Sequence, residues 1–264
     1  MGVLLVERAA AVTTITIHRP EVRNAMNNAA FEELAGILAE AARNPDDRVL
    51  VLTGAAGAFC SGGDLSLPAG MAVDAATAEA FPLTTFKILS TVVASAALAL
   101  HRFPKPIIAA VDGIAAGAGA CLAFGCDLVL ASETARFSLA FVRRGLSLDC
   151  GGSWLLPRLI GLHKAKELAF FGDWVDAHEA VRLGLANRVF TAAEFPAAVR
   201  TWAERLAAQP PIAVSLIKQS LNRSLQLSMA DALEQEAMAQ AVCSASPEFA
   251  RALAAFARPR APKG

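Results

Sequence analysis

Apolar positions divide the chain into segments with distinct spacings. Residues 3–7 and 12–18 are rich in β-forming residues and are separated by a small turn, which predicts an N-terminal hairpin. Residues 31–42 carry apolar side chains at helical spacing. Two continuous apolar runs, 48–53 and 106–111, each lead into a glycine-containing loop, and this pattern predicts strands that are buried on both faces.

The following segments alternate between helical and extended patterns. Residues 75–100 predict a helix, residues 117–125 a helix of small residues, and residues 127–131 a further strand. Strands that alternate with helices are typical of an α/β fold with largely parallel pairing. The sequence therefore predicts an α/β body.

From residue 191 onward the pattern is helical throughout. The expected helices cover residues 192–207, 212–226, 229–245 and 247–257. An all-helical segment after an α/β body suggests a packing or assembly element. We therefore divide the chain into a core, residues 1–200, and a C-terminal helical region for oligomerisation, residues 201–264.

Composition narrows the class of protein. The 264 residues are 55% hydrophobic and only 18% charged, which fits a well-packed globular protein with further surface buried between subunits. Lys+Arg and Asp+Glu both number 24, so no global field attracts nucleic acid or an anionic membrane. Local groups must therefore hold any anionic ligand.

Targeting and metal signals are weak. The first eight residues lack the basic flank and long apolar stretch of a secretory signal. The apolar run 88–100 is too short to span a bilayer, and the run 107–126 contains Asp112 and glycines, so we expect no transmembrane helix. The five cysteines form no C-x-x-C pair, which predicts reduced thiols, no metal site and a cytoplasmic protein.

Asp149 is the only carboxylate between Glu133 and Glu167, and it lies in a segment of apolar and small residues. An acid isolated in this way loses hydration, which raises its pKa and suits it to act as a general base on a weak carbon acid. The alternative is structural, because an Asp just before Gly-Gly often caps a helix or forms a turn by bonding backbone N–H groups. The local sequence alone favours that structural role.

Two loops of small residues, 53–65 and 112–121, follow buried strands. Small residues let backbone N–H groups approach a ligand closely, and the second loop opens a predicted helix whose free N–H groups stabilise negative charge. Gly117 and Gly119 lack the third glycine of a dinucleotide-binding motif, and the chain has no phosphate-binding P-loop motif. Taken singly, each loop is better explained by a tight turn with close helix–sheet packing than by a ligand site.

Four segments in order carry a resemblance to a known family. They are residues 18–27, 59–64 (Phe-Cys-Ser-Gly-Gly-Asp), 111–122 and 126–127. Together they resemble the crotonase (enoyl-CoA hydratase/isomerase) superfamily. The resemblance implies a ββα superhelix, and it implies that the helical tail is a trimerisation region, so that the protein forms a homotrimer or a dimer of trimers.

The resemblance also implies an acyl-CoA thioester substrate, with no cofactor besides the coenzyme A that the substrate carries. Its carbonyl oxygen would sit between the backbone N–H groups of Gly63 and Ala118, which stabilise an enolate oxyanion. The family's pattern places further substrate or CoA contacts at Arg23, Ala25, Ser61, Gly62, Asp64, Leu65, Gly117, Cys121, Phe141 and Lys218. By the same analogy residues 65–83 border the acyl pocket.

The sequence departs from the hydratase pattern at two positions. Hydratases of the family use two glutamates to handle water, and Cys121 and Phe141 occupy the matching positions here. The run 141–158 instead resembles the isomerase branch, in particular the ring 1,2-epoxyphenylacetyl-CoA isomerases, and related isomerases place an aspartate at the position of Asp149. One carboxylate suffices for isomerisation, because it can take a proton from one carbon and return it to another.

Several alternatives stay open at this stage. Arg23 is expected near the CoA phosphates or as a solvated arginine after a turn, and Lys218 and Arg223 either reach those phosphates or solvate a helix face. Two other functions compete with an isomerase of unsaturated or epoxidised acyl-CoA. One is a hydratase of 2-enoyl-CoA, and the other is a catalytically idle CoA-binding scaffold.

Overall fold

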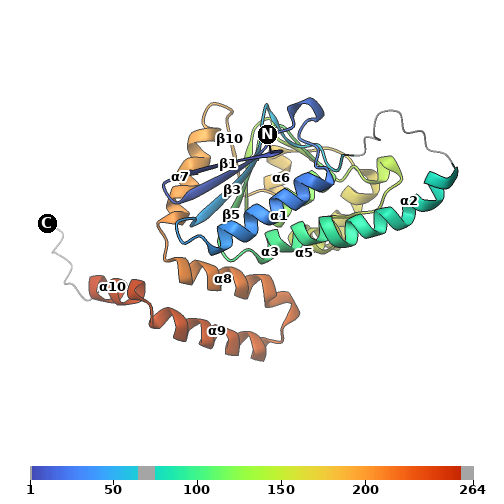
Figure 1. Cartoon of the computed structure of the whole chain (residues 1–264). Helices are drawn as coiled ribbons and strands as arrows, with labels where there is room; N and C mark the ends of the chain where they lie inside the picture. The colour runs from blue at the N-terminus through green and yellow to red at the C-terminus, as the bar shows by residue number, and fades with distance from the viewer. Residues whose placement is uncertain (1, 65–74, 257–264) are drawn as a thin grey trace.

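The computed structural model describes residues 2–64 and 75–256, and it opens with the predicted hairpin (Figure 1). Strands β1 (Leu4–Ala9) and β2 (Val12–Ile17) pair antiparallel. Helix α1 (Asn28–Arg43) follows, and the side chain of Asn27 caps its start by accepting a 2.9 Å hydrogen bond from the Ala30 N–H. Both predicted N-terminal elements are therefore confirmed.

Two sheets form the body. The first has the order β1-β2-β3-β5-β7-β10, with parallel pairing from β2 onward, and the second has the order β4-β6-β8-β9. The strands not yet defined are β3 (Val49–Gly54), β4 (Ala58–Cys60), β5 (Ile107–Val111), β6 (Ile114–Ala116), β7 (Leu128–Ser132), β8 (Arg136–Ser138), β9 (Val175–Asp176) and β10 (Arg188–Phe190). Successive strands alternate between the sheets (β3 to β4, β5 to β6, β7 to β8), which confirms the α/β class and the ββα superhelix.

Both faces of the larger sheet are buried. Alternate residues of β3 face opposite ways, so that Leu50 and Leu52 join the core with the second sheet while Val49 and Val51 pack toward α7 (Phe195–Ala207). This two-sided burial explains the uninterrupted apolar runs in the sequence. The short strands of the second sheet were not predicted, because two or three residues are too few to show a period.

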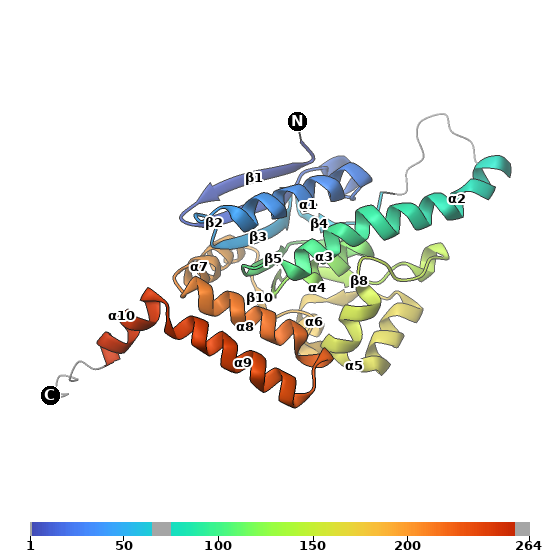
Figure 2. The same ribbon diagram turned by 60° about the horizontal axis from the view of Figure 1, so that its bottom comes forward.

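Helices cover the rest of the body. The predicted helix at 75–100 is one continuous rod in which α2 (Ala75–Ile88) passes through a π-helical turn (Leu89–Val93) into α3 (Ala94–Arg102). Its α2 end projects beyond the sheets (Figure 2). Helix α4 (Ala118–Gly125) is also as predicted. Two further helices, α5 (Gly152–Phe171) and α6 (Ala177–Leu183), follow and were not predicted from the sequence.

The length of this continuous helix tests the expectation that the apolar run 88–100 is too short to span a bilayer. Within the described residues, the 22-residue stretch Phe81–Arg102 is long and apolar enough to cross a bilayer by length and composition alone, with a mean hydropathy of 1.7. The expectation that this apolar run is too short was therefore wrong, because the helix continues on both sides of residues 88–100. Only 17% of this stretch is buried inside the structure, and a single helix of this kind does not by itself indicate a membrane protein.

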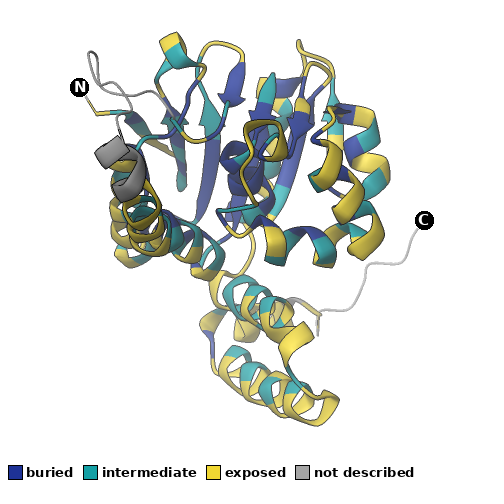
Figure 3. Cartoon of the chain, turned by 90° about the vertical axis from the view of Figure 1, so that its right-hand side faces the viewer, coloured by how far each residue is buried: buried dark blue, intermediate teal, exposed yellow. Residues whose placement is uncertain are grey.

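The C-terminal helices leave the body after α7. Helices α8 (Pro211–Arg223), α9 (Met229–Ser244) and α10 (Pro247–Phe256) run below the sheets, and many of their residues are exposed (Figures 1 and 3). The predicted division after residue 200 falls inside α7, whose Ala203 and Ala207 pack on the larger sheet. The part that extends from the body therefore begins with α8.

Candidate active site

The first predicted loop, residues 53–65, contains β4, and the turn before α1 is hydrogen-bonded to the residues that follow this strand. The Met26 N–H donates to the Gly62 carbonyl and the Asp64 N–H donates to the Met26 carbonyl, both at 2.8 Å. These two bonds form a parallel bridge between Met26 and Gly63 in which the N–H of Gly63 points away from Met26. Within the described residues that N–H donates no hydrogen bond.

Two polar residues that the sequence reading missed fix this loop. Asn24 is fully buried, and its amide donates to the carbonyls of Ala55 (2.8 Å) and Ala58 (2.6 Å). Arg19 forms a 2.8 Å ion pair with Asp64 and donates to the Ala25 carbonyl at 2.7 Å. Together they hold the turn against the end of β4 and give Asp64 a structural partner.

The other predicted contacts of this loop lie together. The Ser61 N–H donates to the Arg23 carbonyl at 3.0 Å, and the Ser61 hydroxyl donates to the Val22 carbonyl at 2.9 Å. Ala25 is buried beneath the turn, whereas Arg23 is exposed in a left-handed conformation (φ 52°). Leu65 and residues 65–74 of the predicted acyl-pocket border lie outside the described residues.

The second predicted loop brings a second N–H to the same place. Gly117 adopts a positive φ of 53° and turns the chain from β6 into α4, so that Ala118 is the first residue of the helix. An N–H at this position has no acceptor within its helix, and that of Ala118 donates to no other described residue. A Cβ added to Gly62 would lie 3.8 Å from the Ala118 nitrogen, so the two loops are in contact.

Close packing keeps the two loops together. A Cβ on Gly119 would lie 2.4 Å from the Cys60 carbonyl oxygen, which is closer than real Cβ atoms approach. The packing explanation of the loop is therefore correct for Gly119. This packing role is compatible with a binding role for the free N–H groups. Because α4 can reach the end of β4 only where a side chain is missing, Gly119 also keeps the two loops close together.

Asp149 lies just before α5, and it is not a helix cap. The N-cap position is Gly151, and no side chain caps the helix. Asp149 Oδ1 is buried, and among the described residues it is the one buried side-chain nitrogen or oxygen without a hydrogen-bond partner. Cys150 and Gly151 both have positive φ angles (48° and 81°), and the turn that they form is closed by the Gly152 N–H, which donates to the Asp149 backbone carbonyl at 2.9 Å. The capping alternative is therefore wrong.

The surroundings of Asp149 are uncharged. Burial raises the pKa of the Asp149 carboxyl to about 6. Cys121, one turn into α4, meets the start of α5, because a Cβ on Gly152 would lie 2.8 Å from its Sγ. Burial, and then the nearby Asp149 carboxylate, raise the pKa of the Cys121 thiol far above its ordinary value, so that it stays protonated.

Two further thiols and an aromatic ring add to the uncharged surroundings of the site. Burial also raises the pKa of Cys150, and it raises that of Cys60 to about 12. Phe141 is buried with its ring tip 3.8 Å from a Cβ position on Gly117. Cys60, Cys121 and Cys150 are buried free cysteines, and buried thiols of this kind pack as small apolar side chains. The site thus combines one carboxylate and two free N–H groups with a largely apolar lining.

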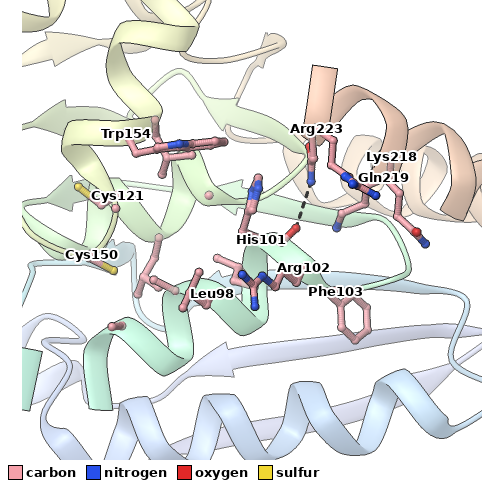
Figure 4. A pocket seen from close by; sticks show the side chains of 18 of the residues that line it. Leu98, His101, Arg102, Phe103, Cys121, Cys150, Trp154, Lys218, Gln219 and Arg223 are labelled. Atoms are coloured by element: carbon pink, nitrogen blue, oxygen red, sulfur yellow. Dashed lines mark hydrogen bonds between the residues drawn. The ribbon is translucent and has the colours of Figure 1, made fainter. Parts of the chain in front are cut away.

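A pocket of about 760 Å³ adjoins this group (Figure 4). Cys121 and Cys150 form part of its wall, and further residues of α3, α4, α5 and α8 line it. It is large enough for a drug-sized ligand. In the part of the chain that the structure describes, no three His, Cys, Asp or Glu side chains are grouped so as to hold a metal ion.

Lys218, predicted to contact the CoA moiety, already has partners within the chain. Its ammonium forms a 2.7 Å ion pair with Asp127 and donates to the Lys105 carbonyl at 3.0 Å, and its side chain is only 8% exposed. A buried, paired ammonium offers no free charge to the phosphates of CoA. Arg223, five residues further along α8, is exposed and lines the pocket.

Comparison with known proteins identifies the family. The model of the enoyl-CoA hydratase/isomerase family matches residues 7–263, almost the whole chain. The chain belongs to the enoyl-CoA hydratase/isomerase family. Members of this family are enzymes that act on CoA thioesters, so acyl-CoA binding follows for this chain.

Individual relatives carry different activities. The chain is 35% identical to the 1,2-epoxyphenylacetyl-CoA isomerase of Escherichia coli over 96% of its own length and 94% of the relative's. It is 33% identical to the short-chain-enoyl-CoA hydratase of Clostridium acetobutylicum, with 99% and 97% covered. The crystal structure of an enoyl-CoA hydratase from Bacillus anthracis superposes with a TM-score of 0.88 at 31% identity, covering 96% of this chain and 95% of that one. Membership in the enoyl-CoA hydratase/isomerase family therefore does not decide between isomerisation and hydration.

Proposed function

We propose that this enzyme is an acyl-CoA isomerase that shifts a double bond or rearranges an epoxidised ring through an enolate, with Asp149 as its acid–base group. The observation that carries the proposal is the buried, unbonded Oδ1 of Asp149 among protonated thiols and apolar residues. A desolvated carboxylate with a pKa near 6 is a stronger base than an ordinary aspartate and is still ionised at neutral pH.

The proposed reaction begins with the thioester carbonyl oxygen between the N–H groups of Gly63 and Ala118. Asp149 removes a proton from the carbon next to the carbonyl of a 3-enoyl-CoA, and the electron pair moves onto the oxygen to give a dienolate. The two N–H groups stabilise that negative charge, each by about 10²–10³ in rate. Asp149 then returns the proton to C4, the carbon at the far end of the conjugated dienolate. This step leaves a 2-enoyl-CoA and regenerates the carboxylate.

A hydratase reaction lacks a second carboxylate here. Addition of water requires one group to activate the water and another to protonate the carbon. Cys121 and Phe141, which stand where the family resemblance places hydratase glutamates, supply neither group, because one is a protonated thiol and the other a ring. The proposal therefore favours isomerisation, and no cofactor is needed beyond the CoA moiety of the substrate.

A substrate panel tests the proposal. The purified chain is offered a 3-enoyl-CoA, crotonyl-CoA and 1,2-epoxyphenylacetyl-CoA, and absorbance and product masses are followed. We expect conversion of the 3-enoyl-CoA, of the epoxide, or of both, with slow or no hydration of crotonyl-CoA. Rapid hydration of crotonyl-CoA would show a hydratase, and binding of all three thioesters without turnover would show an idle scaffold.

We also propose that α8–α10 form the assembly surface of a homotrimer or a dimer of trimers. Large apolar side chains are exposed along these helices: Ile212, Ile217, Leu221, Leu225, Met229, Leu233, Met238, Val242, Phe249, Leu253 and Phe256. Exposed apolar surface of this extent is typical of an interface between subunits. Sedimentation of the full chain is expected to give a trimer or hexamer, and a monomer at micromolar concentration would contradict the proposal.

A further inference from the structure

The pocket beside Asp149 changes character along its length. Its inner wall next to the site is apolar and includes Cys121, Leu122 and Leu155. Its other lining residues on α3 and α8 include His101, Arg102, Lys218 and Arg223, and none of the lining residues is Asp or Glu. In Figure 4 the two thiols lie on one side of the space and Lys218 and Arg223 on the other, with His101 and Arg102 between them.

We propose that this pocket receives the acyl group of the substrate and that Arg102 and Arg223 bind a carboxylate at the far end of that acyl chain. This inference rests on the proposed function, because it assigns the substrate class of the same site.

The two arginines stand on either side of one helix junction. The Asn222 amide donates a 3.1 Å hydrogen bond to the His101 carbonyl and so ties α8 to α3. Arg102 and Arg223 are the next residues along the two helices, and both line the pocket. Two guanidinium groups at one junction can bind both oxygens of a carboxylate.

Their charge is not already neutralised. Within the described residues neither Arg102 nor Arg223 forms an ion pair or a side-chain hydrogen bond, whereas Lys218 is paired with Asp127. Burial first, and then the charges of Lys218 and Arg102, lower the pKa of His101, so its imidazole is neutral at pH 7. The two arginines are thus the free positive charges of the pocket.

The position of the pocket suits an extended acyl chain. Ala118, whose N–H faces the proposed carbonyl position, begins α4, and the pocket borders the same helix from Cys121 to Gly125. These eight residues span roughly 10 Å along the helix axis. An acyl chain about as long as α4 therefore places its thioester at the two N–H groups and its far end beyond α4, toward α3 and α8.

Paired substrates test this inference. Initial rates are compared for 3-enoyl-CoA substrates with six- and eight-carbon acyl chains, each with and without a terminal carboxylate. In the wild type, we expect the carboxylate to raise kcat/KM for at least one length. Arg102→Met and Arg223→Met should each lower the ratio of the carboxylated to the uncarboxylated substrate about three- to tenfold. Arg205→Met, on an exposed part of α7, should leave the ratio unchanged.

Comparison within each pair of substrates shows whether the arginines bind the terminal carboxylate or the phosphates of CoA. The CoA phosphates are present in both substrates of a pair, so arginines that bind those phosphates would lower both rates equally and leave the ratio unchanged. That outcome, or no effect of either arginine, would overturn the inference.

A binding measurement keeps the inference testable if no substrate is turned over, which would contradict the proposed function instead. Calorimetric titration with the saturated thioesters adipyl-CoA and hexanoyl-CoA, and with suberyl-CoA and octanoyl-CoA, is then expected to show arginine-dependent preference for the carboxylated member. Equal affinities in both pairs would overturn the inference independently of catalysis.

Discussion

Asp149→Asn is expected to lower kcat on the turned-over 3-enoyl-CoA by about 10²–10⁴ while KM changes little. The amide has the shape of the carboxylate but cannot accept the proton of the substrate. The CoA moiety is bound elsewhere, so its affinity should be retained. Steady-state rates of the purified variant measure the effect.

The pH dependence of the wild type provides a second readout of the same group. Burial raises the pKa of Asp149 to about 6, and only the carboxylate form acts as a base, so kcat should rise with pH and level off above about 6. The residual rate of Asp149→Asn should lack this rise. Asp46→Asn, an exposed aspartate remote from the site, should follow the wild type. A variant at position 149 that retains full kcat would rule out the proposed base.

Stability distinguishes loss of the base from loss of the fold. The pKa of Asp149 lies above its ordinary value of 3.8 in the folded protein, so folding favours the protonated form and deprotonation destabilises the native state. This stability is fully present below about pH 4 and is lost as pH rises through about 6. Asp149→Asn should therefore be no less stable than the wild type at pH 4 and more stable at pH 8, by about 1–2 kcal/mol after allowance for solvent screening of a half-buried group.

The sequence predicts the larger elements of this fold because burial leaves a pattern in them. The continuous apolar runs of β3 and β5 and the spacing in α1 reflect which faces pack. The strands of the second sheet carry no such signal, because β8 and β9 have three and two residues. Their places follow only from the superhelix that the family resemblance implies.

The candidate site was predictable where a residue type stands out locally. Asp149 is conspicuous as an isolated acid, but only the structure rejects a capping role, because this depends on Gly151 at the N-cap and on the unbonded Oδ1. The pairing of Lys218 with Asp127 could not be predicted, because Asp127 lies 91 residues earlier in the chain. Arg19 shows the same limit, since its pairing with Asp64 across 45 positions leaves no spacing pattern in the sequence.

The second large effect is expected from removal of one N–H at the proposed carbonyl position. Ala118→Pro deletes the N–H of Ala118, and this residue is the first of α4, where proline fits a helix because the N–H has no helical acceptor. Gly117, with φ 53° and ψ −125°, does not adopt the α conformation that a following proline disfavours. We expect kcat/KM to fall by at least about 10²–10³, because one oxyanion donor is lost and the proline ring occupies its place.

Ala118→Gly is the matched control, because it keeps the N–H while changing the same position. Its rate should stay within about tenfold of the wild type, since glycine near a helix start costs up to about 1 kcal/mol in stability and removes no donor. Circular dichroism and thermal unfolding of both variants establish that α4 is intact. If Ala118→Pro folds and retains the wild-type rate, the carbonyl oxygen is not bound at this N–H, and the enolate mechanism would have to place its negative charge elsewhere.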